Sequence, residues 1–142
     1  MYKKATAELT HTLKKVNSYE DFEALHKEDL TETSLDQLLK HYVDEGDLTI
    51  YNIIKRAEID ISYGYKIFRG QHKPARDILI KLSIAMKLNL LNTQRLLKAG
   101  HVNELYPRNE RDAILLFAIN NSMTIAEIDE LLYSRDQETL KS

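Results

Sequence analysis

Apolar residues recur along most of the chain at intervals of three and four, which is the spacing of one face of an α-helix. Few segments alternate like strands, and only four glycines and two prolines interrupt the pattern. We therefore expect an all-α protein. The pattern predicts helices at 19–27, 35–45, 50–57, 61–69, 75–87, 93–99, 108–121 and 125–133.

Residues that favour helix N-caps precede most of these segments, because their side chains can accept hydrogen bonds from the first free amides of a helix. The expected caps are Ser18, Ser34, Thr49, Asp60, Asn92 and Thr124. Ser34 and Thr124 also begin capping boxes. The chain ends, up to about Thr6 and after Ser134, are expected to be loosely held.

Two segments of the chain align without a gap, Arg76–Leu97 and Arg111–Leu132. Each begins with Arg-Asp and ends with Leu-Leu. The spacing of apolar residues in each predicts a helix, a short turn and a second helix. Two explanations stay open, a structural repeat or the shared apolar spacing of any two amphipathic helix pairs. The Arg-Asp pairs are either buried ion pairs at helix starts or ordinary surface charges.

The stretch from Leu48 onward resembles the lambda-repressor-like, or Xre-type, helix-turn-helix family, and the resemblance covers about residues 35–99. The features that carry it are Leu48-Thr49, the apolar pair Ile53-Ile54, the turn residue Ile59, Gly70, Pro74, and the apolar helix with Leu79, Leu82, Ala85 and Leu88. It implies a five-helix domain at residues 34–103. A helical arm (1–33), a C-terminal helix pair packed on the domain (104–134) and a tail (135–142) would complete the chain.

The resemblance further implies that the helix beginning at Ile61 enters the major groove of double-stranded DNA. Ser62, Tyr65 and Lys66 would lie on the base side. Thr49, Arg69, Lys73 and Arg76 would lie on the phosphate side. Between Thr49 and Arg76 there are six basic and two acidic residues, a local charge of +4 in a chain whose formal charge is -2.

Two apolar residues depart from the family pattern at this surface. Many members carry glutamine where this chain has Ile50 and Ile61, and an isoleucine can do no more than touch a thymine methyl. An apolar patch made of Ile50, Ile61 and Tyr65 would suit a protein contact instead. In a third interpretation, the two isoleucines pack on each other and lock their helices together.

The interior of the motif also differs from the family. Gly64 stands at the usual aliphatic position in the middle of the second helix, and we expect Tyr63 and Tyr65 to fill the space beside it. Ile54 and Glu58 stand where the family usually has alanine and glycine. In the C-terminal helix pair, Leu115 and Leu116 make one helix apolar on more than one face. That pair is expected either to form a homodimer contact or to close the core over the first and fifth helices of the domain.

Composition argues against several other classes of function. There are no cysteines, and the five histidines show no metal-ligand spacing, so we expect no metal site and no cofactor. Neither a phosphate-binding glycine loop nor a nucleophile motif occurs, so we expect no enzyme and no catalytic residue. No apolar run is long enough to span a membrane and no signal peptide is evident, so we expect a cytoplasmic protein without membrane contact.

The sequence thus favours a DNA-binding transcription regulator of bacterial or phage type. The alternative is a protein-interaction adaptor built on the same helix-turn-helix scaffold, with an apolar surface in place of the base-contacting one.

Overall fold

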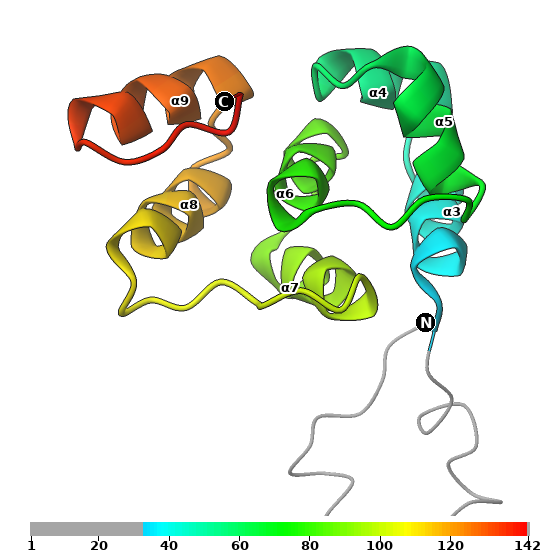
Figure 1. The fold of residues 1–142 in the computed structure, drawn as a ribbon, viewed down its shortest axis with the longest axis horizontal. Coiled ribbons are helices and arrows are strands. Elements are labelled where there is room, and N and C mark those ends of the chain that lie inside the picture. Colours follow the sequence, from blue (N-terminus) through cyan, green and yellow to red (C-terminus); the bar gives the residue numbers. More distant parts are fainter. Residues whose placement is uncertain (1–32, 142) are drawn as a thin grey trace, which may run out of the picture. The chain divides into compact units, whose positions relative to one another are not determined.

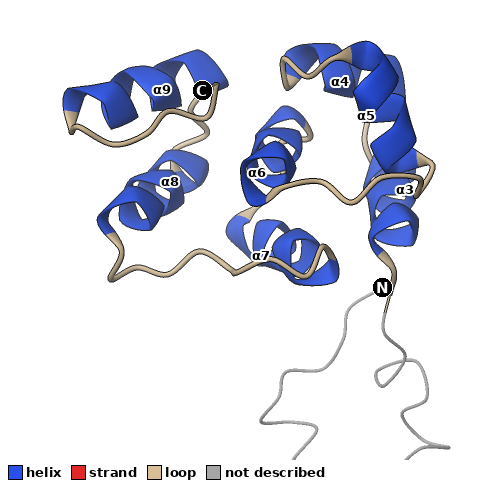
Figure 2. Cartoon of the chain, in the orientation of Figure 1, coloured by secondary structure: helices blue, strands red, loops and turns tan. Residues whose placement is uncertain are grey.

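The computed structural model describes residues 33–141, and the chain divides into two units between Thr33 and Ser34. The expected N-terminal arm, with the helix capped by Ser18, lies outside the described residues. The described part contains helices joined by loops and no strand (Figure 2). The helices are α3 (Leu35–Glu45), α4 (Ile50–Arg56), α5 (Ile61–Phe68), α6 (Arg76–Ala85), α7 (Leu90–Ala99), α8 (Glu110–Asn120) and α9 (Ile125–Ser134).

Most of the expected helix caps are confirmed. The Thr49 hydroxyl accepts a hydrogen bond from the Asn52 amide at 3.2 Å, and the Asp60 carboxylate accepts one from the Tyr63 amide at 3.0 Å. The predicted cap at Asn92 is wrong. Asn89 caps α7 by accepting from the amide of Asn92 at 2.8 Å, so the helix begins three residues earlier than predicted.

The helices from α4 onward form three successive hairpins, α4–α5, α6–α7 and α8–α9. The turn of each hairpin contains one non-glycine residue in the left-handed region, with φ of 57° at Glu58, 55° at Lys87 and 54° at Ser122. The N-cap of the second helix follows two residues later, at Asp60, Asn89 and Thr124. One turn geometry therefore serves all three hairpins, although none of the three left-handed residues is glycine.

Helices α6 and α7 lie in the middle of the described unit, with α3 to α5 on one side and α8 and α9 on the other (Figure 1). The expectation that the C-terminal pair closes the core over the first and fifth helices, α3 and α7, is therefore only half right. Helix α8 contacts α7, whereas α3 lies on the opposite side of the central pair. The reason is that α6 and α7 carry buried apolar side chains toward both neighbours.

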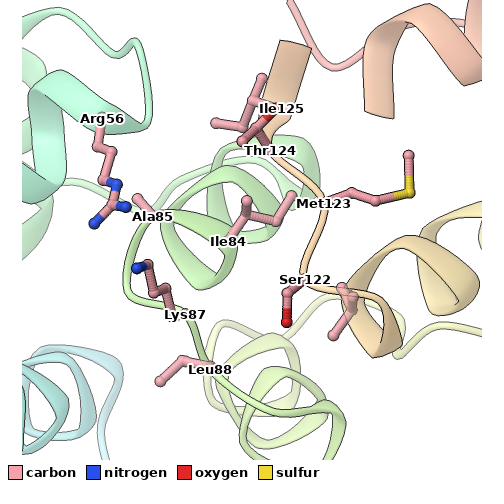
Figure 3. Close-up of a pocket in the computed structure, with 10 residues that line it drawn as sticks. Arg56, Ile84, Ala85, Lys87, Leu88, Ser122, Met123, Thr124 and Ile125 are labelled. Carbon is pink, nitrogen blue, oxygen red and sulfur yellow. The ribbon is translucent and has the colours of Figure 1, made fainter. Parts of the chain in front are cut away.

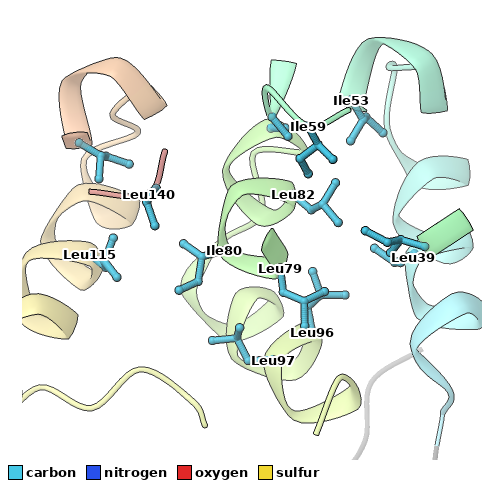
Figure 4. Close-up of a cluster of buried hydrophobic side chains, with 14 of the residues drawn as sticks. Leu39, Ile53, Ile59, Leu79, Ile80, Leu82, Leu96, Leu97, Leu115 and Leu140 are labelled. Atoms are coloured by element: carbon cyan, nitrogen blue, oxygen red, sulfur yellow. The ribbon is translucent and has the colours of Figure 1, made fainter. Parts of the chain in front are cut away.

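The core follows this arrangement. Figure 4 shows Leu82 of α6 extending toward the side of α3 and α4, while Ile80 extends toward Leu115 and Leu140 on the C-terminal side. All but Leu140, which is 1% exposed, have no exposed surface. Because neighbouring positions of α6 face opposite ways, this helix joins the two halves into one hydrophobic cluster.

The segment from Arg135 to Lys141 is held against the helices. The expectation that the chain is loosely held after Ser134 is therefore wrong over these residues. The Leu140 amide donates to the Asp129 carboxylate at 2.6 Å, and the Glu138 carbonyl accepts from Nε of Arg111 at 2.9 Å. Lys141 forms an ion pair with Glu58 at 3.1 Å. The buried Leu140 side chain explains why this stretch lies against the helices, since leaving it in water would cost about 1.5–3 kcal/mol.

The internal repeat is confirmed by hydrogen bonds at matching positions. Nε of Arg76 donates to the Asn103 carbonyl at 2.8 Å, as Nε of Arg111 does to that of Glu138. The Leu105 amide donates to the Gln94 side chain at 2.7 Å, as the Leu140 amide does to Asp129. Each contact recurs 35 positions later, so the repeat extends beyond the aligned helices to residues 76–105 and 111–140.

Candidate nucleic-acid interface

Helix α5 presents one buried and one solvent-facing side. Gly64 and Ile67 are buried, the latter completely. Ser62, Lys66 and Arg69 are exposed. With 3.6 residues per turn, positions 62, 66 and 69 fall on one face, opposite the buried pair. The structure therefore brings together three of the residues expected to contact DNA.

Close approach of α4 and α5 depends on Gly64. A Cβ atom at this position would lie 2.7 Å from side-chain atoms of Ile54, closer than real contacts allow. Ile54 of α4 thus occupies the space that a side chain at position 64 would take. Tyr63 and Tyr65, which the sequence places beside the glycine, are half-buried against the hydrophobic cluster. Tyr63 also packs edge-on against the ring of His72, with the centroids 4.7 Å apart.

Tyr65 and Arg69 form one contact on the exposed side of α5. The Arg69 guanidinium carbon lies 5.5 Å from the centre of the half-buried Tyr65 ring, within the range of a cation–π interaction. This contact restricts the guanidinium at the C-terminal end of the helix. Lys66, Arg69 and the exposed Lys73 form no ion pair with any other described residue, so their charges are available to an external anion.

Thr49 occupies the start of α4 and is exposed. Its hydroxyl oxygen accepts the capping hydrogen bond described above, which leaves its O–H to donate outward. A hydroxyl at this place can both begin the helix and contact a phosphate oxygen.

Arg76, expected on the phosphate side, has a different role. Its guanidinium donates to both carboxylate oxygens of Asp112, at 2.9 and 2.7 Å, and to the carbonyls of Asn103 and Glu104 at 2.8 and 3.0 Å. Four of its five N–H groups are thus engaged inside the protein. We therefore remove Arg76 from the candidate interface.

A second ion pair links the two Arg-Asp sequences in the opposite direction. Arg111 donates to both carboxylate oxygens of Asp77 at 3.0 and 2.9 Å, so the two repeats exchange arginines and aspartates. Asp77 sits beside Arg76 on α6, and Arg111 beside Asp112 on α8. Of the two explanations left open by the sequence, partly buried ion pairs at the helix starts are the observed one.

Electrostatics at these pairs favours the charged forms. Burial by itself would raise the pKa of Asp112. Hydrogen bonds from Arg76 and the Tyr106 amide, together with the charges of Arg76 and Arg111, outweigh burial and lower that pKa below its ordinary value. Burial would lower the pKa of Arg111, but its hydrogen bonds and charge interaction with Asp77 raise it.

Ile50 and Ile61 have unlike environments. Ile50 is half-buried and packs against the hydrophobic cluster. Ile61 is 41% exposed and is not part of that cluster, and Tyr51 on α4 is 44% exposed. The start of α5 therefore keeps one apolar side chain in solvent beside the polar face.

Within residues 33–141, no group of three or more His, Asp or Glu side chains is placed to hold a metal ion. No helix in the same part of the chain is long and apolar enough to cross a membrane. No protein-family model, curated protein or solved structure matches this chain significantly.

Proposed function

We propose that this chain binds double-stranded DNA through α5 and acts as a transcription regulator of bacterial or phage type. The observation that carries the proposal is the polar face of α5, where Ser62, Lys66 and Arg69 lie in line and opposite the buried face. An α-helix fits the major groove of B-DNA, and a face of this kind can touch base edges and phosphates together. The resemblance to Xre-type proteins supports the same assignment.

Each residue of this surface has a chemical task in the proposal. Ser62 and Lys66 donate hydrogen bonds to base edges, and the half-buried Tyr65 borders them. Arg69 and Lys73 neutralise phosphates on one side of the groove, and the Thr49 hydroxyl contacts a phosphate at the start of α4. Phosphate contacts supply most of the affinity, and base contacts supply the discrimination between sequences.

Charge distribution agrees with a local rather than a global attraction to DNA. With Arg76 engaged elsewhere, five basic and two acidic residues remain between Thr49 and Ala75, a local charge of +3 against -2 for the whole chain. Glu58, one of the two acidic residues, is paired with Lys141. Binding should therefore weaken steeply with salt, with a slope of about -0.9 in log K against log salt for each phosphate contact.

A selection of bound duplexes from random sequences, followed by anisotropy titrations, tests this function. Lys66→Gln with Arg69→Gln should reduce affinity for the selected duplex by more than tenfold and flatten the salt slope. Lys98→Gln, which removes an exposed charge on α7, is the matched control and should leave both unchanged. Failure to enrich any duplex at low salt, or equal losses in the control, would refute the proposal.

A protein-interaction adaptor is the second candidate, favoured by the exposure of Ile61 and Tyr51. Exposed apolar and aromatic side chains commonly anchor protein contacts. In this case Ile61→Asp should abolish binding of a purified partner, and Lys66→Gln should not. The DNA proposal predicts the opposite order for duplex binding. Lys66→Gln should weaken it more than Ile61→Asp does, because Lys66 carries more of the contact than Ile61.

A further inference from the structure

A pocket lies between the two repeats, away from the polar face of α5. It encloses ≈ 340 Å³ and is formed by the end of α6, the turn between α8 and α9, and one side chain of α4. This volume falls at the lower end of the range of small-molecule sites, about 300–1,000 Å³. The residues that decide its chemistry are Arg56, Ile84, Lys87, Ile119, Ser122 and Ile125.

The apolar part of the pocket comes from equivalent positions of the repeat. Ile84 of α6 corresponds to Ile119 of α8, 35 residues later, and both line the pocket. Figure 3 shows Ile84 and Ile125 extending into the space between α6 and the start of α9. The two hairpins therefore contribute aliphatic side chains from equivalent positions to the same pocket.

The charged residues of the pocket do not follow the repeat. Lys87 occupies the left-handed position of one turn, and Ser122 occupies the same position of the other. Figure 3 shows the ends of Arg56 and Lys87 on the same side of α6, near Ala85. Both side chains are exposed, neither forms an ion pair with another described residue, and no acidic residue lines the pocket. Two cations thus border one end of an apolar cavity with no carboxylate to balance them.

We propose that this pocket binds a small amphipathic anion. The apolar body would lie against Ile84, Ile119 and Ile125, and the anionic head would lie between Arg56 and Lys87. A head group at this end reduces the repulsion between the two cations, and the buried body displaces water from the isoleucine side chains. The ligand would connect α4 with the α8–α9 hairpin.

Octanoate is a suitable probe because it has one carboxylate and a short apolar chain. Calorimetric titration of the full chain without DNA should show saturable binding, independent of whether the DNA proposal is correct. Each methylene added from hexanoate to octanoate should raise the affinity about threefold to fourfold. Octanol, which has the same chain without the charge, should bind at least tenfold more weakly.

Substitutions at the charged end separate this site from general surface binding. Arg56→Gln and Lys87→Gln should each weaken octanoate binding several-fold, and Lys66→Gln on α5 should not. Ser122→Lys, at the position equivalent to Lys87 and with nearly the same φ, should strengthen it. Methyl NMR signals of Ile84 and Ile125 should shift on titration in the original chain. Absence of saturable binding, equal binding of octanol, or an equal loss in the Lys66 variant would overturn the proposal.

Discussion

Arg76 on α6 donates to both carboxylate oxygens of Asp112 on α8, 36 residues further along the chain, at 2.9 and 2.7 Å. The Asp112 side chain is 7% exposed and that of Arg76 is 25% exposed. Asp112 also accepts from the Tyr106 amide at 2.9 Å, so one carboxylate holds both a neighbouring helix and the loop that precedes α8. This pair joins the α8–α9 hairpin to α6.

Removing this carboxylate should therefore destabilise the protein strongly. Asp112→Ala leaves the partly buried Arg76 charge without its partner, and we expect a loss of about 3–5 kcal/mol in the free energy of unfolding. Urea unfolding followed by circular dichroism measures this loss. Asp44→Ala, at an exposed acidic residue near the end of α3, is the control and should change the free energy by less than about 0.5 kcal/mol. Similar stability of the two variants would contradict the role of the pair.

Stability should also depend on pH through the same carboxylate. The pKa of Asp112 is lowered in the folded protein, so above the ordinary aspartate pKa, about 3.9, its ionisation favours folding. That contribution is lost as the pH falls toward the lower, folded-state pKa, because the unfolded chain takes up the proton more readily. The free energy of unfolding, measured by urea titration from pH 6 to pH 3, should fall less steeply in Asp112→Asn than in the original chain. Parallel curves would show that another carboxylate controls acid unfolding.

Local features of the fold could be predicted from the sequence because they depend on neighbouring residues. Thr49, Asp60 and Thr124 cap their helices as expected, since a cap needs only its own side chain and an amide three residues later. The prediction that Asn92 caps α7 was wrong, because Asn89 caps this helix three residues earlier. Both asparagines are good caps, and the position of the left-handed turn residue Lys87, which selects Asn89, is not evident from the spacing.

Features that depend on distant residues could not be predicted. The alignment of the repeats correctly indicated equivalent environments for Arg76 and Arg111, but not that each binds the other's aspartate neighbour. The family resemblance predicts Arg76 on the phosphate side, whereas in the structure it binds Asp112. The exposed face with Ser62 and Lys66 needed only helical periodicity, which the sequence does show.

The contact between Gly64 and Ile54 offers a direct test of how α4 and α5 pack. Gly64→Val should destabilise the protein by about 1–3 kcal/mol, because its side chain would overlap that of Ile54. Ile54→Ala should cost about 2–5 kcal/mol by leaving a cavity. In the double variant the new valine can occupy that cavity, so the combined loss should be smaller than the sum of the two. Thermal unfolding of all four proteins gives the coupling, and additive losses would argue against the contact.

Asp129 provides a stabilising substitution suggested by the repeat. Its Oδ1 accepts from the Leu140 amide, while its buried Oδ2 has no hydrogen-bond partner. At the equivalent position, Gln94 accepts from the Leu105 amide and also donates to the Leu105 carbonyl at 3.0 Å. Asp129→Asn places an N–H donor where the unpartnered oxygen lies, which allows the second hydrogen bond to form with the carbonyl of Leu140. We expect a gain of about 1 kcal/mol in the free energy of unfolding. Asp129→Ala, which removes both polar atoms, is the control and should be less stable than the original chain. Urea unfolding measures the difference. If the asparagine variant is no more stable than the original chain, the second hydrogen bond seen at Leu105 does not form at Leu140.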